Sequence, residues 1–377
     1  MDTATQALLG AVVGQACFSH KLGRRAVAWG AVGGLLPDLD VLAVLGQGPL
    51  GEFVHHRGFT HALWFGPLVG PLLGASVWRY HARRLAKARA RAAGAERGPS
   101  ACAAPPHPGD PLLRTAWMGL FALALFTHPL IDVFTSYGTQ LFAPFSNQRY
   151  ALHAVGIIDV TYSGILVAAL ALGRALRGNA AAVRRVAWAA LALSWAYLGY
   201  GLWLNERARD AVTARLAADG VSEARVQVYP TLLQPYLRRI VVRSGDEVWV
   251  GLYTPWREGG PAWQRFRQSA SHPSIDALMR TREAAIFVWF AMGEVATRVR
   301  PLPDGYAVEI DDLRYGHLGL PERGLWGIRG ITDRSGSLRG PIEIVTHRGS
   351  ARLGETFGAL WRAAWGDFSG SGFDTGH

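Results

Sequence analysis

Long apolar stretches are confined to the first 204 residues of the chain, and they restrict the possible folds more than any other feature. Six such segments can be marked, at residues 6–18, 26–45, 62–78, 115–131, 155–172 and 186–204. A helix that crosses a bilayer needs about 20 residues, with a lower limit near 17. The last five segments meet or nearly meet this length, whereas the first is too short. We therefore expect an α-helical membrane bundle of about five membrane segments, preceded by a short N-terminal helix.

Basic residues between the apolar segments set the expected orientation of this bundle. Lys and Arg are frequent at residues 21–25, 79–97 and 174–185, and they are sparse at residues 46–61 and 133–153. Because basic loops stay in the cytoplasm, the two sparse loops should face outward from a bacterial inner membrane. The net charge of +11 therefore reflects membrane topology, and no nucleic-acid partner is expected.

The rest of the sequence divides into a linker, a second domain and a tail. Residues 90–111 are rich in Ala, Gly and Pro, which predicts a flexible cytoplasmic linker within a membrane domain of residues 1–205. Residues 206–365 alternate β-branched and aromatic residues with turn signals, which is typical of a soluble α+β domain. We expect this domain on the periplasmic or extracellular side, because the last apolar segment starts on the basic side. Residues 366–377 are rich in Gly and Ser and predict a disordered tail.

Histidine and aspartate residues cluster at the outer ends of the apolar segments. The candidates, with one arginine among them, are Asp38, Asp40, His56, Arg57, His61, His128, Asp132 and Asp159. His128 and Asp132 are four residues apart, so on a helix they share one face and could bind one metal ion or simply each other. A carboxylate at membrane depth is costly unless it is paired, hydrated or bound to metal. The clusters therefore predict a metal site at the outer face of the membrane.

Several of these residues have a second possible role. Asp38 or Asp40 could cap a helix, and Asp159 could cap the segment at residues 155–172. Arg57 could pair with a nearby carboxylate or bind an anionic substrate.

The residue types narrow the metal and its chemistry. Imidazole mixed with carboxylate suits Zn²⁺, with Mn²⁺ or Fe²⁺ as alternatives. The candidate ligands outnumber the three protein ligands of a single catalytic zinc, so we expect one or two metal ions. Two ions are a usual arrangement for phosphoester hydrolysis. The expected metal ligands are His56, His61, His128, Asp132, Asp38 and Asp159, and the expected catalytic residues are Asp38, Asp40 and Arg57. The sequence has no GxSxG, Walker or HExxH motif, so a serine nucleophile has no support.

Three motifs in fixed order carry a resemblance to a known family. LPDLD (residues 36–40), HHRGFTHAL (55–63) and THPLIDVFTSYGTQLFAPFS (127–146) are similar to the YdjM-like family of membrane-bound, metal-dependent hydrolases. The resemblance implies metal-binding roles for Asp38, Asp40, His56, His61, His128 and Asp132. Many members have a histidine where this chain has Gln6. The family's distant similarity to zinc-dependent phospholipases C and zinc nucleases implies phosphoester cleavage.

The sequence thus predicts a membrane-embedded hydrolase that uses metal-activated water on a phosphoester or a lipid-linked substrate taken from the lipid bilayer. The alternative is a metal-binding membrane protein without catalysis, such as a sensor or transporter. A transporter should place its ionisable groups near the middle of the membrane, whereas these residues are expected at one face.

Overall fold

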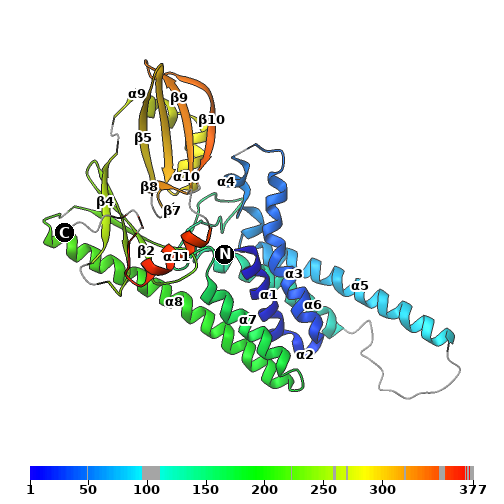
Figure 1. Cartoon of the computed structure of the whole chain (residues 1–377). Coiled ribbons are helices and arrows are strands. Elements are labelled where there is room, and N and C mark those ends of the chain that lie inside the picture. Colours follow the sequence, from blue (N-terminus) through cyan, green and yellow to red (C-terminus); the bar gives the residue numbers. More distant parts are fainter. Residues whose placement is uncertain are drawn as a thin grey trace.

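A helical part and a sheet-rich part follow each other along the chain (Figure 1). The computed structural model describes residues 1–48, 50–95, 111–221, 223–257, 260–268, 271–317, 320–347, 353–369, 371 and 373. The helical part contains α1 (Thr3–Cys17), α2 (Ser19–Leu22), α3 (Arg24–Leu35), 3₁₀-helix η1 (Leu36–Val44), α4 (Gly51–His55), 3₁₀-helix η2 (Phe59–His61), α5 (Phe65–Ala95), α6 (Pro111–Asp132), α7 (Val160–Ala175) and α8 (Ala180–Ala218). Most of the predicted linker, residues 96–110, lies outside the described residues.

Glycines four residues apart let α1 and α3 pack with their backbones in contact. A Cβ atom on Gly10 would lie 2.1 Å from the carbonyl oxygen of Gly30, and a Cβ on Gly34 would lie 2.3 Å from that of Gln6. Such small residues at regular spacing are typical of close helix pairs in membranes. The end of α3 is thereby held against the start of α1.

A second glycine series joins α5 to α6. Gly66, Gly70 and Gly74 line one face of α5, and a Cβ on Gly70 would lie 2.4 Å from the Cα of Ala122 in α6. Only glycine fits at this distance, so the two helices are fixed in register along their length. This packing fixes the position of α6, which ends at Asp132.

The prediction of a bundle of about five membrane segments is wrong. The described residues form eleven α-helices and two four-stranded antiparallel sheets, and among them only α6 is long and apolar enough to cross a membrane. The apolar window of α6 is 56% buried inside the protein, which also fits the core helix of a protein that does not cross a membrane. The predicted multi-pass topology is therefore not supported. The periplasmic placement of the C-terminal part depends on that topology and is not supported either.

The other apolar segments fail for local reasons. Pro37 starts a 3₁₀-helix, so α3 keeps 12 residues. The helix α7 has 16 residues, because it begins only at Val160. The helices α5 and α8 are long, with 31 and 39 residues, but no 18-residue stretch of either helix is apolar enough to qualify as a membrane span.

The C-terminal part is built on two antiparallel sheets. Its strands are β1 (Arg225–Pro230), β2 (Arg238–Ser244), β3 (Glu247–Tyr253), β4 (Ala262–Arg267), β5 (Val295–Leu302), β6 (Gly305–Asp312), β7 (Gly316–His317), β8 (Leu320–Gly324), β9 (Trp326–Asp333) and β10 (Leu338–Thr346), and its helices are α9 (Pro273–Met279), α10 (Arg282–Phe290) and α11 (Leu353–Ala364). One sheet has the order β1-β2-β3-β4 and the other β10-β9-β6-β5, with β7 and β8 as a separate hairpin. The C-terminal end of α8 packs on β1, while its other half packs on α7.

The two parts share one hydrophobic core. Phe53 of α4 and Tyr137, which follows α6, are buried in the same cluster as Phe287, Phe290 and Val308 of the C-terminal part. The ring of Phe53 stacks on that of Phe290 at 4.4 Å between centroids. Figure 1 shows the base of the β5–β10 sheet and α10 next to α4. The segment that precedes Arg57 and the segment that follows Asp132 are therefore packed against the C-terminal part.

Candidate metal centre

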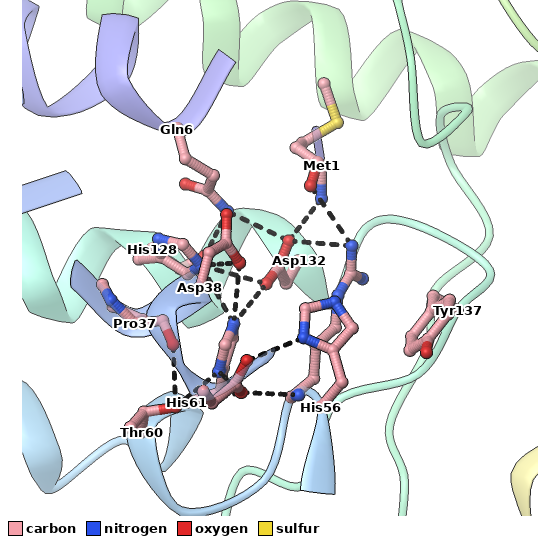
Figure 2. A network of polar contacts seen from close by, with 12 residues as sticks. Met1, Gln6, Pro37, Asp38, His56, Thr60, His61, His128, Asp132 and Tyr137 are labelled. Carbon is pink, nitrogen blue, oxygen red and sulfur yellow. Dashed lines mark hydrogen bonds and ion pairs between the residues drawn. The ribbon is translucent and has the colours of Figure 1, made fainter. Parts of the chain in front are cut away.

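Four buried side chains from three segments point toward one place (Figure 2). Asp38 comes from η1, His61 from η2, and His128 and Asp132 from the last turn of α6. The exposed fraction is 8% for Asp38 and 0% for the other three residues. Asp38, His61 and His128 form the one group in the described part of the chain whose ligand atoms lie close enough to hold a metal ion, all within 4.8 Å of one another.

The separations between the imidazole nitrogens and the carboxylate oxygens are those of neighbouring metal ligands. The Nε2 atoms of His61 and His128 are 3.0 Å apart. The Oδ1 atom of Asp38 lies 3.5 and 3.3 Å from these two nitrogens, and the Oδ2 atom of Asp132 lies 3.3 and 3.5 Å from them. A tetrahedron with metal–ligand bonds of about 2.0–2.1 Å has edges of about 3.3 Å. Asp38, His61 and His128 can therefore hold one ion together, and Asp132 Oδ2 lies at ligand distance from both imidazole nitrogens.

Hydrogen bonds on the far side of each imidazole turn its Nε2 lone pair toward the centre. His128 Nδ1 lies 2.7 Å from the carbonyl oxygen of Gly34, which can only accept, so this nitrogen carries the proton. His61 Nδ1 lies 3.2 Å from Asp40 Oδ2 and donates to that carboxylate. In the neutral rings both Nε2 atoms are then acceptors, and they face each other and two carboxylates. Such an arrangement is repulsive unless these groups take up a proton or a cation occupies the centre.

The two aspartates of η1 are ionised in this environment. Burial acts to raise the pKa of Asp38, but the contacts with His128 and His61 outweigh it and hold the pKa well below its ordinary value. The pKa of Asp40 is likewise lowered, because its contacts with His56 and His61 outweigh burial. Both carboxylates are therefore charged at neutral pH, as metal binding requires.

Three donors hold Asp132 by the carboxylate oxygen that does not face the centre. Its Oδ1 atom accepts a hydrogen bond of 3.0 Å from Gln6 Nε2, lies 3.4 Å from Arg57 Nη2, and contacts the amino group of Met1. Its Oδ2 atom is buried and has no hydrogen-bond donor among the described residues. The donors thus fix the carboxylate so that Oδ2 is presented to the centre.

Arg57 is placed behind Asp132 rather than at an open surface. Its side chain is only 3% exposed, and Nη1 donates to Thr135 Oγ1 at 2.8 Å while Nη2 pairs with Asp132. Arg57 also has a positive φ of 59°, which is uncommon for a residue with a side chain. Its backbone N–H donates to Asp40 Oδ2 at 3.0 Å, so the carboxylate helps to hold this turn.

His56 and Asp159 lie outside the group of four. His56 Nδ1 is 2.8 Å from Asp40 Oδ1, and the side chain is 20% exposed, so it stands at the edge of the centre. Asp159 caps α7 by accepting from the N–H of Tyr162, and it also accepts from the hydroxyl of Tyr197 at 2.8 Å. The structure therefore brings Asp38, His61, His128 and Asp132 together, adds Asp40 and His56 around them, and places Asp159 elsewhere.

Sequence reasoning did not find all of the residues that shape this centre. The carbonyl of Gly34 and the hydroxyls of Thr60 and Thr135 were not singled out, although Thr60 Oγ1 lies 3.0 Å from His61 Nδ1. A carbonyl group leaves no trace in residue identity. The glycine spacing shared by α1 and α3 is the one signal that could have pointed to a close approach near Gly34.

Asn in place of Asp40 tests the support of His61. The amide keeps the shape but loses the charge that holds the imidazole proton, and such supporting contacts typically contribute about 10–100-fold to metal affinity. We expect Asp40→Asn to bind zinc about 10–100-fold more weakly, measured by competition with a chromophoric chelator. Unchanged affinity would show that His61 is oriented without Asp40.

Comparison with known proteins adds a family but no characterised relative. No curated protein matches the chain, and no solved structure does. The model of the YdjM inner membrane protein family matches residues 1–208, which include every residue of the centre described above. The match covers more than half of the 377 residues, so the chain belongs to the YdjM inner membrane protein family.

Proposed function

We propose that this chain is a metal-dependent hydrolase of the inner membrane, which holds one divalent ion, preferably Zn²⁺, between Asp38, His61, His128 and Asp132. The observation that carries the proposal is the convergence of two Nε2 atoms, which lie 3.0 Å apart, with two carboxylate oxygens that lie 3.3–3.5 Å from these nitrogens. Imidazole and carboxylate together favour Zn²⁺ over Mg²⁺ or Ca²⁺, with Mn²⁺ or Fe²⁺ as alternatives. The family supports the location in the inner membrane.

The chemistry would be the hydrolysis of an ester by water. A divalent ion in this place lowers the pKa of bound water from about 15.7 to about 7. His56 is the candidate proton acceptor, because Asp40 holds its Nδ1 at 2.8 Å and its side chain reaches the exposed edge of the centre. In this proposal Asp40 orients both His61 and His56, and Arg57 keeps Asp132 in place.

Exposed apolar side chains next to the ligands support a substrate that resides in the membrane. Leu39, between the two aspartates of η1, is 51% exposed, and Leu42 is 58% exposed. Phe59, two residues before His61, is 51% exposed, and Phe145 is 87% exposed. The segments that turn their polar side chains inward thus turn apolar ones outward, as a surface in contact with acyl chains would. We propose a lipid or a lipid-linked phosphoester as the substrate.

A metal-binding role without catalysis is the second candidate, and one observation favours it. Four protein ligands would fill the four positions of a structural zinc site, whereas catalytic zinc sites usually keep one position for water. In the hydrolase, one carboxylate must therefore give way or the shell must expand to five ligands. Asp38 is the ligand with the greatest exposure, so it is the one placed to move.

Activity measurements separate the two candidates. Zinc-loaded protein in lipid nanodiscs should release product from an activated phosphodiester such as bis(4-nitrophenyl) phosphate, or from a phospholipid in the same disc. His56→Ala should retain zinc and lose about 100-fold or more in kcat, since a positioned proton acceptor contributes at least about that factor. Zinc-loaded wild-type protein that cleaves neither substrate would favour the non-catalytic role, and an unchanged kcat in His56→Ala would exclude His56 as the acceptor.

A further inference from the structure

The part of the chain beyond the family match reaches the metal centre through one buried ion pair. Arg314 and Asp312 are both fully buried, and Nη2 of the arginine lies 2.7 Å from Oδ2 of the aspartate. The Nε atom lies 3.0 Å from Oδ1 of the same carboxylate, which leaves Nη1 directed away from it. A guanidinium held in this two-point manner has a fixed direction.

The third guanidinium nitrogen of Arg314, Nη1, binds the segment that follows α6. It donates to the carbonyl oxygen of Ser136 at 2.9 Å and to that of Tyr137 at 3.3 Å. These residues come directly after Thr135, three residues beyond Asp132. The arginine thus fixes the backbone at the point where the chain leaves the metal centre.

From this segment the contacts continue to a proposed metal ligand. Thr135 Oγ1 donates to the carbonyl of Asp132 at 2.8 Å and accepts from Arg57 Nη1 at 2.8 Å. Arg57 pairs in turn with the Asp132 carboxylate, and its guanidinium lies 4.7 Å above the ring of Tyr137. Figure 2 shows Tyr137 beside His56, with their ring centroids 5.4 Å apart. Displacement of the segment at residues 135–137 would therefore move the group that holds Asp132.

We propose that Arg314, oriented by Asp312, is a positioning residue of the metal centre, and that the C-terminal part is a component of that centre. The inference rests on the proposed metal site and extends it beyond the residues that define the family. Apolar packing alone, such as Phe53 on Phe290, holds the two parts together but does not fix the direction of two carbonyl groups. Arg314 provides that direction for the carbonyl of Ser136, and it shares the carbonyl of Tyr137 with Arg149, whose Nη2 lies 3.5 Å from the same oxygen.

A second buried arginine offers a matched control. Arg238 also lies in the C-terminal part with 0% exposure, and it donates to the carbonyls of Ala154 at 3.0 Å and Gly201 at 3.2 Å. Those carbonyls precede α7 and belong to α8. Arg238 therefore joins the two parts in the same manner as Arg314, but through residues that do not bind the proposed metal ligands.

The experiment compares Arg314→Met with Arg238→Met in the full-length protein. Both variants should lower the midpoint of thermal unfolding, because each removes buried hydrogen bonds. Only Arg314→Met should weaken zinc binding, by about 10–100-fold as for other supporting contacts of metal ligands, measured by chelator competition. Asp312→Asn, which keeps the side-chain shape, should weaken zinc binding several-fold and serves as the test if Arg314→Met does not fold.

The outcomes separate the two proposals. Wild-type zinc affinity in Arg314→Met, or an equal loss of affinity in Arg314→Met and Arg238→Met, would overturn the positioning role. If wild-type protein itself binds no zinc, Mn²⁺ or Fe²⁺, the metal site fails instead, and thermal unfolding of the two variants then reports only on stability.

Discussion

Replacement of His128 by alanine is expected to reduce the zinc content of the purified protein from about one ion per chain to nearly none. The change removes one of two imidazole ligands and leaves His61 and the carboxylates to hold the ion in a buried site. Zn²⁺ then loses one of its two nitrogen ligands, and the cavity left by the side chain weakens the fixed geometry of the others. Elemental analysis after purification in chelator-free buffer, with zinc added and the excess removed, measures the effect directly.

Two further variants make this experiment decisive. His20 is an exposed histidine at the end of α2, so His20→Ala should keep the wild-type zinc content. Asp132→Asn should lower the zinc content, because the amide keeps the shape of the side chain but removes the charge that binds a cation. Equal metal in wild type and all three variants, or no metal in any of them, would contradict the proposed site.

Part of this centre could be predicted from sequence because short-range geometry determines it. His128 and Asp132 are four residues apart on a helix, which places both on one face whatever the rest of the fold does. The pairing of these residues with Asp38 and His61 depends on the packing of α3 and α5 against α6. Helix packing of this kind is determined by glycine contacts between segments far apart in the chain.

The distinct roles of neighbouring residues could not be predicted. Asp38 and Asp40 are two residues apart, and sequence alone does not show which of them meets the metal. In the 3₁₀-helix η1, Asp38 reaches both His61 Nε2 and His128 Nε2, while Asp40 reaches the opposite nitrogen of His61. His56 was grouped with the expected ligands, but it lies beside Asp40 at the edge of the centre.

The prediction of about five membrane segments is wrong because apolar composition does not determine how far a helix continues. Residues 26–45 are apolar throughout, yet Pro37 divides them into an α-helix and a 3₁₀-helix. The described part of residues 225–364 contains both strands and helices. Their contacts with the helical part, such as Arg314 with Ser136 and Tyr137, join residues about 180 positions apart, and no local pattern predicts them.

Removal of the metal is expected to destabilise the folded protein strongly. Without a cation, two carboxylates and two imidazole nitrogens face one another at 3.0–3.5 Å inside the protein, and this repulsion must be relieved by protonation or by movement of the segments. An ion present at a thousand times its dissociation constant stabilises the folded state by about 4 kcal/mol. Addition of dipicolinate should therefore lower the midpoint of thermal unfolding by several degrees, and excess zinc should restore it.

The His128→Ala variant determines whether this stabilisation arises at the proposed centre. The midpoint of thermal unfolding of this variant should already be low. It should not change with dipicolinate or zinc, because the variant binds little metal that a chelator could remove. A chelator effect of equal size in wild type and His128→Ala would mean that the stabilising ion binds elsewhere in the chain. Since His128 is buried among α1, α3 and α6, a metal ion bound there would link the glycine-packed helices to η1 and η2. The ion would then stabilise the fold as well as take part in the proposed hydrolysis.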